Sequence, residues 1–144
     1  MSILNLTQHA ASPAQVAAGV VEPEHFGIEK ATVQALLTFP AKDIHGLRLK
    51  DAAVRLVKLM RDNGVTEAMI GGLPALMLPL QAEMSFWAIQ PNFAISERVS
   101  EDKVMPDGST RKVAVFRHLG WHKPDNSWFA DYCEAANGRL EIPA

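Results

Sequence analysis

The segment from residue 92 to residue 122 constrains the fold most, because each of its two halves has the composition of a β-strand. Residues 92–101 and 110–119 are rich in β-branched and aromatic side chains. Between them, Pro106, Asp107 and Gly108 supply the residue types that form tight turns. The segment therefore predicts a β-hairpin near the C-terminal end of the chain.

Polar residues on this hairpin predict a site for an anion. Ser96 and Arg98 lie on the first half, and Lys112 and His118 lie on the second. A hairpin with a purely structural role does not need these four side chains together, whereas a phosphate-handling site can use all of them. The alternative for Arg98 is an ion pair with a carboxylate of the hairpin, such as Glu97.

Length and composition narrow the class of protein. The chain has 144 residues, which fits one domain with a single core. Its formal net charge of -2 argues against a protein that holds long nucleic acid by bulk charge. A single cysteine excludes a disulfide framework or a thiolate zinc cluster within one chain. Because we find no run of about 18 apolar residues and no signal-peptide pattern, we expect a cytoplasmic protein with no membrane contact.

Short apolar segments alternate with helical patterns in the first 90 residues, which predicts an α/β fold with a mostly parallel sheet. Strands are expected over residues 3–6 and 68–70. Helices are expected from Ser12 to Gly19, and over residues 28–39, 49–63 and 75–89. Residues 21–27 read as a surface connection. Pro79 falls inside the last of these helices, where a proline is normally unfavourable.

Two loops follow the predicted strands and are candidates for ligand contact. Thr7, Gln8 and His9 come directly after the first strand, and Gly71 and Gly72 come between the second strand and a helix. Open α/β sheets bind ligands at the carboxyl ends of their strands, and a glycine turn before a helix lets backbone N–H groups approach a phosphate. The alternative is that both loops only turn the chain.

Five segments carry a resemblance to a known family. They are NLTQH at residues 5–9, MIGG at 69–72, FAISERV at 93–99, DGS at 107–109 and VFRHLGW at 115–121. Together they resemble the small standalone CRISPR-associated Rossmann-fold (CARF) proteins of the ring-nuclease type. The resemblance implies a Rossmann-like CARF-type domain over residues 1–122, with flanking helices and a C-terminal β-hairpin. Residues 123–144 are expected to form a C-terminal extension packed on the same domain. Within it, Asn126 or Ser127 can cap a short helix over residues 128–136.

The resemblance also implies a function. A homodimer would hold a cyclic oligoadenylate, a second messenger of type III CRISPR defence, and cyclic tetra-adenylate is the ring that we expect. The short single-domain branch that the chain resembles lacks an effector domain, which favours cleavage or sequestration of the ring over signalling, and cleavage is the function that we expect. Non-catalytic sensing or sequestration of the ring is the alternative. A structural module whose aromatic tail near Trp128 contacts a partner is a third.

Metal-independent cleavage of an RNA phosphodiester requires charge stabilisation and proton transfer, and no cofactor is expected. Backbone N–H groups of Gly71 and Gly72, with Arg98 and Lys112, suit the first task. An imidazole can gain or lose a proton near neutral pH, so His118 and His9 are the candidates for the second. The expected ligand-binding residues are Thr7, Gln8, Gly71, Gly72, Ser96 and Lys112. No close spacing of histidines supports a metal site.

Overall fold

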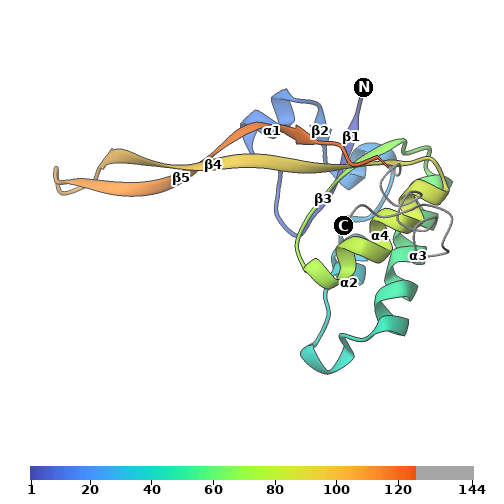
Figure 1. Ribbon diagram of the computed structural model, residues 1–144. Helices are drawn as coiled ribbons and strands as arrows, with labels where there is room; N and C mark the ends of the chain where they lie inside the picture. Colours follow the sequence, from blue (N-terminus) through green and yellow to red (C-terminus); the bar gives the residue numbers. More distant parts are fainter. Residues whose placement is uncertain (126–144) are drawn as a thin grey trace, which may run out of the picture.

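A five-stranded mixed β-sheet organises the computed structural model, which describes residues 1–125 (Figure 1). Its strands lie in the order β2-β1-β3-β4-β5. Their bounds are β1 Ile3–Leu6, β2 Val20–Val21, β3 Glu67–Ile70, β4 Gln90–Val104 and β5 Thr110–His122. The α/β class and the flanking helices expected from the sequence are confirmed.

The expectation of a mostly parallel sheet is wrong. The three pairings among β2, β1, β3 and β4 are parallel and short, whereas β4 pairs with β5 in an antiparallel ladder that runs from Phe93–His122 to Val104–Thr110. A tight turn can join only antiparallel neighbours, so the hairpin itself makes the sheet mixed. Both strands of the hairpin are longer than the sequence indicated.

The edge strand β2 was also missed, because residues 21–27 read as a surface connection. Val20 and Val21 pair in parallel with Ile3 and Leu4, and the 3-10 helix η1 follows at Pro23–Phe26. A strand of two residues is too short for alternation to reveal it. Its position matters because it places Glu22 beside the loop that follows β1.

Three helices cover one face of the sheet and build the main core. They are α2 Lys30–Leu37, α3 Gly46–Asp62 and α4 Pro74–Phe86, with the 3-10 helix η2 at Ala41–Asp43 before α3 (Figure 1). Helix α3, expected over residues 49–63, buries one apolar stripe, as seen at Leu56 and Met60, which are both 0% exposed. Its charged face forms Asp51–Arg55 and Lys58–Asp62 ion pairs with solvent-exposed partners.

Helix α1, Pro13–Ala17, lies on the opposite face of the sheet, where Ile3, Val20 and Met69 form a smaller apolar cluster. A capping box is present at its start, with Ser12 accepting from the Gln15 N–H and Gln15 accepting from the Ser12 N–H. None of the helices in residues 1–125 combines the length and apolar character needed to cross a membrane. The helix expected near Trp128 falls outside the described residues.

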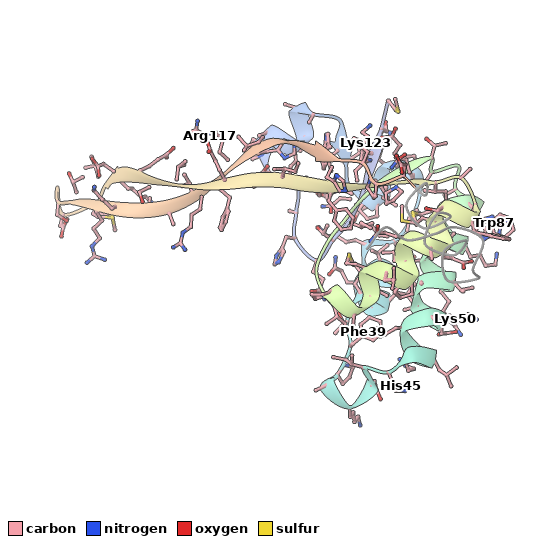
Figure 2. The ribbon with its side chains drawn as sticks, in the orientation of Figure 1. Phe39, His45, Lys50, Trp87, Arg117 and Lys123 are labelled. Atoms are coloured by element: carbon pink, nitrogen blue, oxygen red, sulfur yellow. The ribbon has the colours of Figure 1, made fainter. Side chains whose placement is uncertain are left out.

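Most of the hairpin projects away from the rest of the molecule (Figure 1). We call residues 95–119 the arm. It begins at an irregularity in the ladder between Ile95 and Ser96, where Gly120 and His118 are the successive partners and Leu119 has none. Such a bulge bends the ribbon and increases its twist. Side chains stand out from both faces of the arm, and Arg117 is among them (Figure 2).

Candidate functional site

A pocket of about 320 Å³ lies at the carboxyl ends of β1 and β3. The loop after β1 contributes Thr7, Gln8 and His9, and the turn after β3 contributes Gly71 and Gly72. The rest of its lining comes from Ala10, Gln15, Met69, Ile70, Phe93 and Ala94. Five of the nine residues predicted to form the site therefore lie around one cavity, at the edge where open α/β sheets bind ligands.

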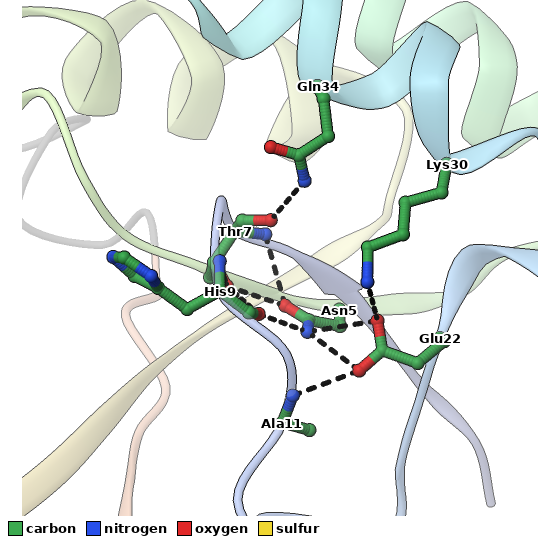
Figure 3. A network of polar contacts seen from close by, with 7 residues as sticks. All are labelled: Asn5, Thr7, His9, Ala11, Glu22, Lys30 and Gln34. Carbon is green, nitrogen blue, oxygen red and sulfur yellow. Dashed lines mark hydrogen bonds and ion pairs between the residues drawn. The ribbon is translucent and has the colours of Figure 1, made fainter.

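The loop after β1 is held by the buried side chain of Asn5 (Figure 3). The Asn5 carbonyl oxygen accepts from the Thr7 N–H at 3.1 Å and from the Thr7 hydroxyl at 2.7 Å. The Asn5 amide nitrogen donates to the main-chain oxygen of His9 at 2.8 Å. The main chain of His9 is thereby fixed, while its imidazole points away from the network (Figure 3).

Glu22, which directly follows β2, anchors this network. Its carboxylate accepts from the Ala11 N–H at 2.9 Å and from the Asn5 amide at 3.1 Å, and Lys30 lies 3.7 Å away. Burial favours a higher pKa for Glu22, but the hydrogen bonds from Ala11 and Asn5 and the charge of Lys30 outweigh burial, so the pKa of Glu22 is lowered. The sequence offered no signal for this role except an acidic residue after two valines.

We expect the Glu22→Gln variant to be less stable than the wild type by about 1 kcal/mol at pH 7, since it weakens hydrogen bonds to a carboxylate. The lowered pKa of Glu22 means that this stabilisation is present above the ordinary carboxyl pKa and is lost as the pH falls through the folded-state value. Urea unfolding of both proteins at pH 7 and below pH 4 measures this. A difference that stays constant with pH would contradict the role of the charge.

Gln8 connects the pocket to helix α2. Its amide nitrogen donates to the Leu37 carbonyl at 3.2 Å, and the Gln34 amide donates to the Thr7 carbonyl at 3.0 Å. A second hollow of about 340 Å³ adjoins here and shares Gln8 and Gly72 with the first. Its remaining lining is mostly apolar and consists of Leu37, Thr38, Phe39, Ile44 and Leu73. The two hollows together give space for a phosphate and an adjacent apolar group.

The glycine turn brings the start of α4 to the pocket. Gly72 has a φ of 113°, a conformation that other residues rarely adopt, and α4 begins two residues later at Pro74. Leu73, which precedes the helix, provides no side-chain cap. The N-terminal end of a helix carries a partial positive charge and favours an anion nearby.

The other four predicted residues lie on the arm and do not line the pocket. Ser96 faces His118 across the ladder, Arg98 faces Phe116, and Lys112 faces Asp102. Strand β4 contributes Phe93 and Ala94 to the pocket, so Arg98 lies roughly 13 Å further along the strand at 3.3 Å per residue. Strand β4 continues to Val104, so residues 96–98 lie within the arm and not beside the two loops.

Contacts are identified for Glu97 and for His118 on the arm. Glu97, proposed as a partner for Arg98, instead lies 3.4 Å from Arg117. His118 contacts Trp121 edge to face, with ring centroids 4.7 Å apart. Its Nδ1 atom is buried and has no hydrogen-bond partner among the described residues. His118 is therefore a packed residue near the start of the arm, away from the pocket lining.

Among the described residues, His9 is the only ionisable side chain that lines the pocket. None of its lining residues within positions 1–125 is lysine, arginine or a carboxylate. The same part of the chain contains no group of three or more His, Cys, Asp or Glu side chains placed to hold a metal ion. A positive side chain that neutralises an anionic ligand must come from outside this lining, because the lining offers only backbone dipoles and neutral polar groups.

Comparison with known protein families gives a match. A family model described as "Uncharacterized protein MJ1673 family" matches residues 1–122. No curated protein and no solved structure matches the chain. The matched segment ends with β5, so it includes the pocket and the whole arm.

Proposed function

We propose that this chain, which belongs to the MJ1673 family, binds a cyclic oligoadenylate and cleaves it without a metal ion. Cyclic tetra-adenylate is the expected ring, and cleavage would end type III CRISPR signalling. The fold would then be of the Rossmann-like CARF type, acting as a homodimer in the cytoplasm. The resemblance of five sequence segments to ring nucleases motivates the ligand.

One observation in the structure carries the proposal. The loop with Thr7, Gln8 and His9 and the turn with Gly71 and Gly72 line one pocket at the carboxyl ends of two parallel strands. Neutral hydrogen-bonding groups and a helix N-terminus suit a phosphate, and the adjoining hollow with Phe39 suits an apolar ring face. This combination fits a nucleotide better than a fully apolar or a fully charged ligand.

The chemistry follows from an RNA phosphodiester in this pocket. The ribose 2'-oxygen attacks the phosphorus, the bond from phosphorus to the 5'-oxygen breaks, and a 2',3'-cyclic phosphate forms. One proton leaves the 2'-hydroxyl and one reaches the 5'-oxygen, so no water or oxidant is consumed. His9 is the lining residue that can transfer a proton, and N–H groups at the glycine turn can stabilise the charge on the phosphate.

A second candidate function is binding of the ring without cleavage, as a sensor or sponge. The position of Arg98 and His118 favours this alternative, because neither side chain lines the pocket of its own chain. Loss of an arginine from a phosphoryl site removes a large part of the charge stabilisation that cleavage needs. The two functions share the same pocket and differ only in turnover.

The deciding experiment is incubation of the purified protein with cyclic tetra-adenylate in EDTA, followed by chromatography over time. We expect linear oligoadenylates that end in a cyclic phosphate. A ring that stays intact but co-elutes with the protein would support the sponge. A ring that neither binds nor changes would contradict both functions.

A further inference from the structure

Two cations face each other near the end of the arm. Lys103 and Arg111 are direct cross-strand partners, one residue pair before the closing pair of Val104 and Thr110. Both are exposed, and neither forms an ion pair with any residue of the described chain. Like charges directly opposite one another destabilise a ladder. An anion bound between them would remove that repulsion.

The arm cannot deliver these cations to the pocket of its own chain. Ala94 lines the pocket, and Lys103 lies nine residues further along the same strand, which corresponds to roughly 30 Å. The arm leads away from the helices and from the loops that form the pocket (Figures 1 and 2). A second chain must therefore be present if the tip is to meet a pocket of this kind.

The arm also lacks the cover that a two-stranded ribbon needs. Isolated hairpins are marginally stable in water. Phe116 is 75% exposed, Val104 73% and Leu119 57%, so apolar groups lie open along its length. Helix α1 lies beside the start of the arm, and its Val16 side chain is 55% exposed. A contact between the arm of one copy and this region of another would cover apolar surface on both.

We propose that two copies pair through their arms about a two-fold axis, so that the tip of each arm reaches the pocket of the other copy. There Lys103 and Arg111 of the tip bind a phosphate of the ligand. In such an antiparallel arrangement the tip of one arm lies beside the start of the other, where Phe93 and Ala94 line the pocket. The uncharged pocket supplies the cradle and the partner copy supplies the positive charge. The assignment of the ligand rests on the proposed function.

Mixing two inactive variants tests this arrangement. Lys103→Ala/Arg111→Ala lacks the tip charges, and Gly72→Ala has a strained pocket turn. Each alone should bind and cleave cyclic tetra-adenylate at least tenfold less well than the wild type. After mixed refolding or co-expression, activity should recover to about one quarter, since half of the dimers are mixed and each mixed dimer has one intact site. If tip and pocket act within one chain, no activity returns and the proposal fails.

The matched control for charge loss is Arg48→Ala/Lys50→Ala. It also removes one arginine and one lysine, both exposed on α3, and Lys50 lies on the helical body away from the arm (Figure 2). This control should keep the affinity and rate of the wild type. An equal loss in both double variants would show that net charge alone matters and would overturn the role of the tip.

A cross-linking experiment tests the contact without any ligand, so that its outcome is independent of the proposed function. In a Cys133→Ser background, Thr110→Cys places a thiol at the tip and Ala10→Cys places one at the pocket. Oxidation of the mixture should give a covalent dimer that neither variant gives alone. A dimer from Thr110→Cys alone, or none from the mixture, would contradict the tip-to-pocket contact. A cross-link in a protein that does not bind the ring would support the contact between arm and pocket and contradict the proposed ligand.

Discussion

Replacing His9 by alanine should slow cleavage of cyclic tetra-adenylate by about 10²- to 10⁴-fold while leaving the affinity for the ring within about threefold. His9 is the histidine that lines the pocket, and its imidazole takes no part in the Asn5 network. The loop is held through the main-chain oxygen of His9, which alanine retains. The fold of the loop should therefore survive, and the effect should fall on proton transfer.

Single-turnover rates with protein in excess, together with the dissociation constant from titration, separate these two effects. His118→Ala is the matched control, because it removes the same side chain from a position packed against Trp121 on the arm. Its cleavage rate should stay within about threefold of the wild type, since His118 does not line the pocket. A larger loss of cleavage rate in His118→Ala than in His9→Ala would contradict the assignment of proton transfer to His9.

Replacing Gly72 by alanine should weaken binding of the ring at least tenfold and lower the melting temperature. At a φ of 113° a side chain imposes strain of order 1–3 kcal/mol, which the turn can relieve only by moving its backbone, N–H groups included. Displaced donors no longer match a phosphate in the pocket. Titration calorimetry gives the affinity and thermal unfolding gives the stability.

Gly71→Ala provides the comparison within the same turn. Gly71 does not have a positive φ, and a Cβ there would meet the Thr7 methyl carbon at 3.9 Å, an ordinary contact. This variant should therefore unfold at nearly the wild-type temperature. If both variants were equally stable and bound the ring equally well, the special conformation of Gly72 would have no bearing on the site.

The elements with a long repeating pattern were predictable from the sequence. The stripe of α3 buries Leu56 and Met60, and the apolar segment at residues 3–6 forms the buried strand β1. Pro79 illustrates what a local rule misses. Helix α4 continues through it, and the fully buried Leu76, Leu80 and Met84 on both sides of the proline show that tertiary packing holds the helix together. Packing of this kind cannot be read from neighbouring residues.

The same limit applies to the candidate site. The two loops after β1 and β3 could be placed together because parallel strands end at a common edge. Arg98 and Lys112 were expected to act with the glycine turn, but they lie on the arm, and the sequence does not show how far its strands extend. Glu22 was missed because its role depends on a two-residue strand. Both cases depend on which distant segments pair with each other in the sheet. This pairing is set when the whole sheet assembles, and neighbouring residues do not reveal it.

The most direct measurement is the binding stoichiometry of cyclic tetra-adenylate, by calorimetric titration of the wild-type protein in EDTA at low temperature, where turnover is slowest. The proposed homodimer has one pocket on each chain and predicts saturation at one ring per chain, with a raised melting temperature in the bound state. A folded protein that shows no heat of binding and no shift in melting temperature at millimolar ring would contradict the proposed ligand.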